Sequence, residues 1–558
     1  MSLKVKYANV SDDQYKNMSV SSDDGQPFSD ASGLTDGVTD DTPWATLEPN
    51  SWVLDGSRKL IKDPVDIGWW SLERSDENGV FGTHPKIRID FGVGSLISAP
   101  GITFQFWPSL GEWCNEMFVT WYYGEYDVVH SESVYPDSAN WYLDAQVDNF
   151  NAIEIEFIST NIPGRFAKLQ SIGIGQMHLF FQDEIVRVSL LNEVDPSACE
   201  LSADELTVEI REKKSRYLNV RENDRIEFYQ NDQLIASHYV QNFSREGENK
   251  YTFKCNSAII LLDGTFYGGF YKDADVKIVL RELFEEIPWS LDDSLSSETI
   301  SGYLPVCTRR EALQQIAFAI GAQVSTQGDG VIHISKISVD DFYPTSAFDK
   351  RSIFTGQSLK KEKPPTEIKI LTYQYQESED AEEETLLENV AVSRGDVIVF
   401  DEPHWGYSYE TAEENLGIET YPNHIEIWGE VSSGAIIWLK GKKYTKVAKK
   451  NTWKPGDSAG NSKAVKVDKA TLVTDKNLDS VMSRLRHYYS LPNLLKGNVV
   501  VDGQKAGDVV EIANPYGNDL TTGYITSMDS EFSINGHIAK IEVRGSDVQG
   551  ANAEVLNR

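Results

Sequence analysis

Short runs in which every second residue is apolar or aromatic recur along this chain, and they constrain its fold more than any other feature. A period of two places alternate side chains on one face, so each run predicts a half-buried β-strand. Strands packed into one segment, with turn-forming Gly, Pro, Asn and Asp between them, predict a β-sandwich of jelly-roll type over residues 22–176. The runs that predict it are KIRIDFG, ITFQFW, MFVTWYYG, NWYLDAQV, AIEIEFIST and KLQSIGIG.

A second series of alternating runs begins at about residue 177 and predicts an antiparallel barrel over residues 177–287. Its hairpin turn is expected at residues 230–233, and its last strand at DVKIVLREL. A third β-rich region, residues 346–550, is expected to form another barrel, with a type I′ turn at Asn535-Gly536. Within that region the acidic run ESEDAEEE predicts a solvated loop, and IIWLKGKKYTKVAKKNTWK predicts a basic pair of strands.

Helical spacing interrupts the strands at two places. Thr308 and Glu311 form the pattern of a capping box, the apolar residues after them recur at helical spacing, and Gly321 is suited to end the helix. AQVST and VIHIS then predict a hairpin, so residues 288–345 are expected to form a small α/β domain. Leu478 to Tyr488 predict a late amphipathic helix. The fold class is therefore mainly β and multidomain, with residues 1–21 as an arm and 551–558 as a tail.

Charge and cysteine content narrow the classes of function. The chain has 86 acidic against 52 basic residues, a net charge of −34, which opposes nonspecific binding to nucleic acid or to an anionic membrane surface. Four dispersed cysteines predict neither a disulfide framework nor a zinc site. The N-terminus lacks the apolar core of a signal peptide, and no window predicts a membrane span. We therefore expect the chain to fold in a reducing cytoplasm, without inserting into a membrane.

The order of these modules resembles that of phage tail baseplate hub proteins. The resemblance is carried by TRREALQQIAFAIGAQVSTQGDGVIHI after the first barrel, and by LDSVMSRLRHYYSLP, GDVVEIANP, TGYITSMDSEF and GHIAKIEVRG near the end. ASGLTDG and VDNFNAIEIEFISTNIPGRFAKLQSIGIG resemble the galactose-binding-like, discoidin-type sandwich of phage and prophage tail proteins. The two resemblances cover most of residues 22–545.

The resemblance implies a structural part of a virion tail, assembled in the bacterial host cytoplasm. Hubs of this family form a homotrimer, in which two barrels per chain match a six-subunit ring of the tail tube. The ring surrounds passing DNA, and the helix-plus-hairpin unit braces the barrels from outside. Tail tube and other tail-tip proteins are the expected partners. Because the sequence stops at Arg558 soon after GHIAKIEVRG, we expect neither a wall-digesting domain nor a fused fibre.

Two groups of side chains are candidate binding residues. Trp69 and Trp70 occupy consecutive strand positions, so at least one is expected to be exposed and able to stack on a sugar, although core packing is favoured for the aromatic residues of this region as a whole. Lysines interleaved with Tyr444 and Trp453 have the pattern of a nucleic-acid strand binder, but docking of an acidic neighbour is favoured. The basic patch comprises Lys440, Lys442, Lys443, Lys446, Lys449, Lys450 and Lys454. The lysines expected to dock a partner are Lys442, Lys443, Lys446, Lys449 and Lys450.

No motif predicts catalysis, a cofactor or a metal site. Asp401 and Glu402 beside His404 form one of many acidic pairs that such a composition produces, and His333 is expected to be a structural residue of its strand. Residues 23–41 are rich in Asp but lack the spacing of a calcium loop. The favoured function is a trimeric, non-enzymatic baseplate hub. The alternative is an adhesin whose sandwich binds host cell-wall polysaccharide, and a wall hydrolase is third.

Overall fold

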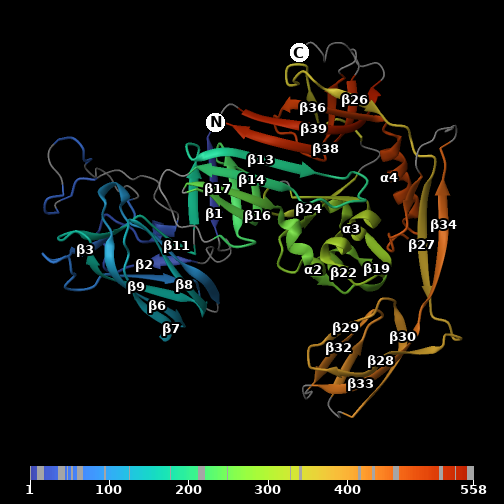
Figure 1. The fold of residues 1–558 in the computed structure, drawn as a ribbon, viewed down its shortest axis with the longest axis horizontal. Helices are drawn as coiled ribbons and strands as arrows, with labels where there is room; N and C mark the ends of the chain where they lie inside the picture. The colour runs from blue at the N-terminus through green and yellow to red at the C-terminus, as the bar shows by residue number, and fades with distance from the viewer. Residues whose placement is uncertain are drawn as a thin grey trace.

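The computed structural model shows several β-rich modules strung along one chain (Figure 1), which confirms the mainly β, multidomain class. No helix in the part of the chain described is long and apolar enough to cross a membrane. The structure describes all residues except 1, 9–17, 36–43, 47, 52–54, 60–66, 93–95, 125, 176, 212–219, 248, 327, 338–341, 413–415, 430–433, 456–463, 515–519, 534–535 and 549–558. Asn535, part of the Asp-rich stretch and the C-terminal tail therefore lie outside the described residues.

The N-terminal module is a β-sandwich, as the alternating runs predicted. In β9, Ile153, Ile155 and Phe157 alternate into the core while the glutamates between them face outward. Five strands form one sheet: β2 (Ser19–Ser21), β4 (Lys86–Asp90), β9 (Ala152–Thr160), β6 (Cys114–Tyr123) and β7 (Asp127–Val134). The facing strands are β11 (Ser171–Ile174), β5 (Ile97–Gln105) and β8 (Asn140–Phe150), with β10 (Phe166–Leu169) paired to β3 (Trp69–Arg74). Two 3-10 turns, η1 (Ser32–Thr35) and η2 (Pro108–Leu110), connect them.

The first barrel begins with a strand that the sequence did not predict. Residues 3–8, expected as part of an arm, form β1 (Leu3–Ala8), which lies between two strands from much later in the chain. Leu3, Val5 and Tyr7 alternate into the barrel core, so the same period-two rule applies to a short run near the terminus. The sheet order is β12 (Met177–Phe181), β1, β15 (Arg225–Gln230), β16 (Gln233–Glu246), β17 (Lys250–Asn256), β14 (Glu205–Arg211) and β13 (Ile185–Glu193).

The second barrel continues the same sheet. β13 pairs antiparallel with β38 (Leu520–Ser533) over six residue pairs, from Val188 opposite Phe532 to Glu193 opposite Ser527. β39 (Gly536–Val548), β36 (Asn493–Val500) and β26 (Ser358–Lys361) follow, while β37 (Val509–Ala513) and β25 (Ser346–Phe348) join on the other edge of β38. Each barrel encloses its own apolar core. The two barrels therefore share one continuous sheet, and lie next to each other in Figure 1.

A small α/β domain packs against the first barrel. Helix α3 (Arg309–Ile320) begins with the predicted capping box, since Thr308 accepts from the Glu311 amide and Glu311 accepts from the Thr308 amide. Gly321 ends it at φ 75°. The hairpin of β23 (Ala322–Ser325) and β24 (Ile332–Lys336) is also confirmed, and β20 (Trp289–Leu291) joins it in parallel.

One helix of this domain contradicts the sequence prediction. DVKIVLREL, expected as a strand, forms α2 (Val276–Phe284), because Val276, Val279, Leu280 and Leu283 face one core at helical spacing and Asp275 caps the helix by accepting from the Lys277 amide. α2 shares its core with α3, so the domain extends back to about residue 258 rather than starting at 288. The remaining elements are η3 (Ala258–Asp263), η4 (Asp293–Leu295), β18 (Thr265–Phe266) with β22 (Cys307–Thr308), and β19 (Gly269–Asp275) with β21 (Thr299–Leu304).

An arm and a tip module interrupt the second barrel. β27 (Ile368–Gln376) pairs with β34 (Thr445–Trp453) and β35 (Val465–Val467) in the arm, which leads to the tip module at the bottom of Figure 1. Helix α4 (Leu478–Ser490), the predicted late helix, covers one face of the arm. The tip consists of two three-stranded sheets: β28 (Glu383–Val392), β33 (Ala435–Lys443) and β30 (His404–Thr411); and β29 (Val397–Val399), β32 (His424–Gly429) and β31 (Leu416–Thr420).

Candidate functional site

The two tryptophans proposed to stack on a sugar are both buried, at 1% exposure each. Trp69 stacks on Phe157 in the sandwich core, with ring centroids 5.2 Å apart, and Trp70 packs edge-on against Trp107 at 5.5 Å on the opposite face of the strand. The expectation that one of them is exposed is therefore wrong. Its reason is that a second small apolar cluster, outside the main sandwich core, covers the face that holds Trp70. Neither ring offers a face to a ligand in solvent.

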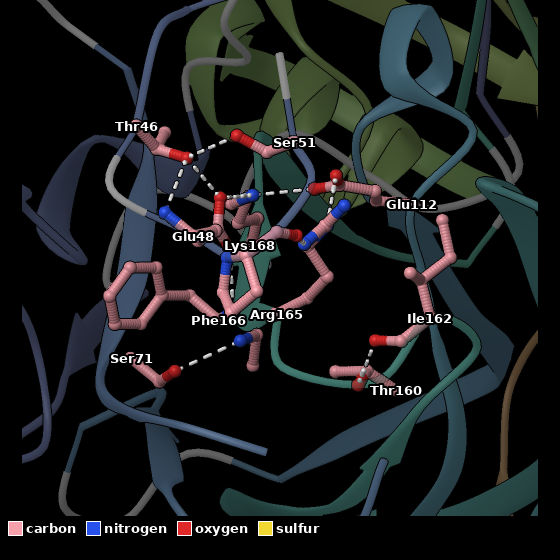
Figure 2. A network of polar contacts seen from close by, with 12 residues as sticks. Thr46, Glu48, Ser51, Ser71, Glu112, Thr160, Ile162, Arg165, Phe166 and Lys168 are labelled. Atoms are coloured by element: carbon pink, nitrogen blue, oxygen red, sulfur yellow. Dashed lines mark hydrogen bonds and ion pairs between the residues drawn. The ribbon is translucent and has the colours of Figure 1, made fainter. Parts of the chain in front are cut away.

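Beside Trp70 lies a buried network of charged side chains, shown in Figure 2. Lys168 on β10 places its Nζ 2.6 Å from Glu48 Oε2 and 2.5 Å from Glu112 Oε2, and it also lies 4.7 Å from the centroid of the Trp70 ring. Arg165 Nε donates to Glu112 Oε1 at 2.8 Å. Two acidic and two basic groups are thus enclosed together, and their charges balance.

Backbone contacts tie the same network to the surrounding loops. The Phe166 amide donates to Glu48 Oε1 at 2.8 Å, and Arg165 Nη1 donates to the Pro49 carbonyl at 2.5 Å. Thr46 Oγ1 donates to Glu48 Oε2 at 2.5 Å. Every charged group therefore has a partner, which is the condition under which buried charges are tolerated. The network fastens the segment around residues 44–51 onto the sandwich and leaves no charged group available for a substrate.

The continuous sheet is the feature that relates the two barrels. The pairing of β13 with β38 fixes their relative position through backbone hydrogen bonds rather than through side-chain contacts alone. The first barrel also carries buried polar groups: the Tyr7 hydroxyl donates to Asp224 Oδ2 at 2.6 Å, and burial raises the pKa of that carboxyl. His238 is fully buried on the core side of β16, where burial lowers its pKa to about 4. The two barrels are therefore joined by backbone pairing, and each has an apolar interior.

The first barrel is also fastened to the small α/β domain. Thr326 Oγ1 donates to Asp204 Oδ2 at 2.6 Å, and burial raises the pKa of this carboxyl. A cavity of about 500 Å³ opens beside this junction, with Glu193, Glu205 and Arg310 among its lining residues. Arg310 Nη2 donates to the Leu201 carbonyl at 2.8 Å and so helps to close the junction. The cavity is polar and open, and its arginine serves the contact between the two domains.

The structure does not bring the five predicted docking lysines together. β33 and β34, expected to pair with each other, belong to different sheets. Lys442 lies over the Trp405 ring at 5.2 Å and Lys443 forms an ion pair with Glu402, both in the tip module. Lys446, Lys449 and Lys450 lie on the arm, where Lys449 pairs with Asp475 at 3.0 Å on the side that faces α4. The acidic run 377–384 lies beside lysines of its own chain, since Glu383 is opposite Lys442.

Lys446 and Lys450 instead share the outer face of the arm with lysines that sequence reasoning missed. Lys369 on β27 and Lys466 on β35 are directly opposite each other in the register, on the face away from α4. Alternation along β27 was the available signal: Ile368 and Ile370 point to the core, so Lys369 points away from it. We call this group the lysine face. Its members are Lys369, Lys446, Lys450, Lys454 and Lys466.

The acidic pair considered for catalysis does not form a site. Glu402 is engaged by Lys443, and His404 Nε2 lies 2.6 Å from Glu384 Oε1. His333 is held by Ser290 Oγ at 2.7 Å and by Asp329, as expected for a structural residue. Among the residues described, no three His, Cys, Asp or Glu side chains are placed to hold a metal ion.

No protein-family model and no curated protein matches this sequence. Solved structures similar to it include the tail protein from Neisseria meningitidis MC58, at 10% identity and TM-score 0.39 over 66% of this chain and 93% of that one. The 43 kDa tail protein of prophage MuSo2 from Shewanella oneidensis has 10% identity and TM-score 0.37 over 66% and 95%. A family 32 carbohydrate-binding module of C. perfringens NanJ, solved with galactose, has 13% identity and TM-score 0.19 over 31% and 99%. Phage and prophage tail proteins are thus among the structures that this chain resembles.

Proposed function

We propose that this protein is a structural component of a phage or phage-derived tail, acting as a trimeric baseplate hub between the tail tube and the tip. The observation that carries the proposal is the pair of barrels built on one continuous sheet through β13 and β38. A chain that holds two barrels rigidly side by side presents two similar units to its neighbours. Three such chains supply six barrels, which is the number needed to match a sixfold ring.

The rigidity of the pair supports this role. Antiparallel pairing over six residue pairs joins the barrels by backbone hydrogen bonds, so one barrel cannot rotate against the other without breaking the sheet. The small domain adds a second brace, because Asp204 of the first barrel accepts from Thr326 of the small domain. A ring that transmits force between a tube and its tip requires such joints.

The charge of the chain suits a ring through which DNA passes. A net charge of −34 weakens contacts with phosphate groups and lets a polyanion pass without being retained. We place the protein in the virion tail, with tail-tube and other tail-tip proteins as partners and DNA as passing cargo. It acts without catalysis, since the charged clusters described above are occupied by structural contacts. The adhesin alternative relied on Trp69 or Trp70, and both are buried.

The test is the mass and shape of the purified chain in solution. Multi-angle light scattering across a concentration series is expected to give three times 62.7 kDa, and electron-microscope images of the same sample are expected to show a ring with six lobes around a hole. Adding tail-tube protein is expected to cap the ring. A chain that stays monomeric at all concentrations and is not recruited by tube protein contradicts the proposal.

A further inference from the structure

The outer face of the arm concentrates positive charge in a chain that is otherwise strongly acidic. Its sheet has two different faces. Ile368 and Ile370 of β27, with Trp453 of β34, pack toward α4, and Arg486 of α4 lies 5.1 Å from the Trp453 ring. The alternate residues, such as Lys369 and Lys450, lie on the face opposite α4. At the end of this face nearest the tip, Tyr375 packs against Phe270 and Tyr303 of the small domain, with ring centroids 5.5 Å and 4.9 Å away. In Figure 1, β27 and β34 lie at the outer edge of the molecule, with α4 on the inner side.

The strand register gathers the lysine face from three strands. Lys446 lies opposite Tyr375, and Lys450 lies opposite Leu371. Lys369 connects the two sides, because it lies opposite Thr452 on one neighbour and Lys466 on the other. Three of these residues are exposed: Lys446, Lys450 and Lys454. The Lys466 side chain is 60% exposed.

Only part of this charge is neutralised within the chain. Glu367 forms an ion pair with Lys369, and Asp468 pairs with Lys466 at 2.6 Å. Among the residues described, the lysine face therefore presents five lysines with two carboxylates paired to them. The whole chain has 86 acidic against 52 basic residues, so a second copy offers an excess of carboxylates to a basic face. At physiological salt, charges farther apart than about 8 Å are screened, which leaves local complementarity to decide the contact.

We propose that the lysine face is a contact surface for an acidic surface of a second copy of this chain, and so forms one of the joints between protomers. The inference rests on the proposed trimer and adds the surface that holds it. β34 is the end strand of its sheet, so its outer edge lies beside the lysines and lets a backbone segment of the neighbour pair next to them.

A nucleic acid fits this face less well. Single-stranded nucleic acids stack their bases on open aromatic faces between basic side chains. Here the aromatic residues are Tyr373 and Tyr375, and Lys446 Nζ lies 4.3 Å and 5.8 Å from their ring centroids. The Tyr373 hydroxyl also donates to the Asp468 carbonyl at 2.5 Å. The rings are therefore engaged by their own chain, and the face offers charge without a stacking platform.

Charge reversal on the full chain tests the proposal. One variant carries Lys446→Glu, Lys450→Glu and Lys466→Glu. The matched control carries the same change of charge at exposed lysines outside the arm: Lys254→Glu, Lys277→Glu and Lys336→Glu. Circular dichroism and the melting temperature establish that both are folded. Sedimentation velocity is expected to show that the arm variant raises the dissociation constant for self-association at least about tenfold and the control leaves it within about threefold. Raising NaCl from about 0.05 to 0.5 M is expected to weaken only the assemblies that keep their lysine face.

The outcomes separate the surface from the trimer. If the unaltered chain forms a trimer and the arm variant forms it equally well, the lysine face is refuted and the trimer stands. If the unaltered chain remains monomeric at all concentrations and tail-tube protein does not recruit it, the trimer and the contact between copies are both refuted. If the unaltered chain binds a labelled single-stranded oligonucleotide and the arm variant does not, the face is a nucleic-acid site instead.

Discussion

Replacing Lys168 by Met is expected to destabilise the sandwich strongly. The Lys168 and Glu48 side chains are each 1% exposed, and that of Glu112 is 7% exposed. Removing the lysine leaves two buried carboxylates with Arg165 as their only basic partner in the network. Breaking a buried ion pair by removing one partner costs about 3–5 kcal/mol, because the remaining charge stays desolvated without compensation. The variant is therefore expected to lose about that much of the free energy of unfolding of this module.

The chain contains a matched control on its surface. Lys86 also lies between two glutamates, at 3.1 Å from both Glu154 and Glu156, but its side chain is 47% exposed. The geometry is similar and the burial is different. Surface ion pairs contribute about 0–1 kcal/mol, so Lys86→Met is expected to cost no more than about 1 kcal/mol.

Hydrogen exchange measured residue by residue suits this test, because it reports on one module of a multidomain chain. The Phe166 amide, which donates to Glu48, and the Ala167 amide, which donates to Ser71 Oγ at 2.9 Å, are the reporters. A loss of about 3 kcal/mol corresponds to an increase of more than about a hundredfold in their exchange rates. Adding Glu112→Gln to Lys168→Met restores the charge balance and is expected to recover part of the loss. Equal costs for Lys168→Met and Lys86→Met would refute the reasoning.

Three further outcomes are expected. His238 is buried with neither ring nitrogen bonded among the residues described, and burial lowers its pKa from 6.5 to about 4. The stability that its neutral form contributes is complete above about pH 6.5, and about 3 kcal/mol of it is lost as the pH falls toward 4. Urea unfolding at pH 7.5 and 5 is expected to show this loss in the unaltered chain and not in His238→Phe. Thr308→Ala is expected to cost about 1 kcal/mol by removing the cap of α3, and Thr308→Ser almost nothing, in the same unfolding assay. Arg484→Met is expected to lower the free energy of unfolding by about 2 kcal/mol, because Arg484 donates to the Phe318 carbonyl at 2.5 Å and to the Ser197 carbonyl at 3.3 Å. Faster hydrogen exchange of the amides at the end of α3 would confirm the prediction, and unchanged exchange would contradict it.

Sequence patterns predicted local structure well where contacts between residues close in the sequence determine it. The capping box at Thr308, the left-handed Gly321 and the hairpin at Asn231-Asp232 all follow from contacts within a few residues. α2 was missed because Val, Ile and Leu in DVKIVLREL satisfy the strand preference, while the spacing of the buried residues satisfies the helical period. A core on one side only, shared with α3, decided between them.

Relations between distant segments were not predictable from periodicity. β1 lies beside β12 and β15, and β13 joins β38 across most of the chain, although nothing in either run specifies its partner. The docking lysines show the same limit. Their spacing suggested one patch, but Lys442 and Lys443 belong to the tip. Lys369 and Lys466, which do lie beside the arm lysines, come from two strands that are far apart in the sequence.

The chain leaves the arm for the tip module and returns from it at a single place, since Gln376 lies directly opposite Thr445 in the register. The tip has its own apolar core, and among the residues described it meets the small domain through Asn423, which donates to the Tyr267 carbonyl, and His424, whose ring lies 4.7 Å from Tyr267. The Tyr444 ring lies 4.8 Å from Phe270. Residues 377–444 are thus an insertion between the two strands of a hairpin, and their strands do not join the sheet of the barrels. Because its two ends are paired, replacing the tip by a short turn is expected to keep the register of β27 with β34, while removing the contacts with Tyr267 and Phe270. The tip is therefore an insertion in the arm hairpin, and we expect this place in the chain to accept other inserted sequences.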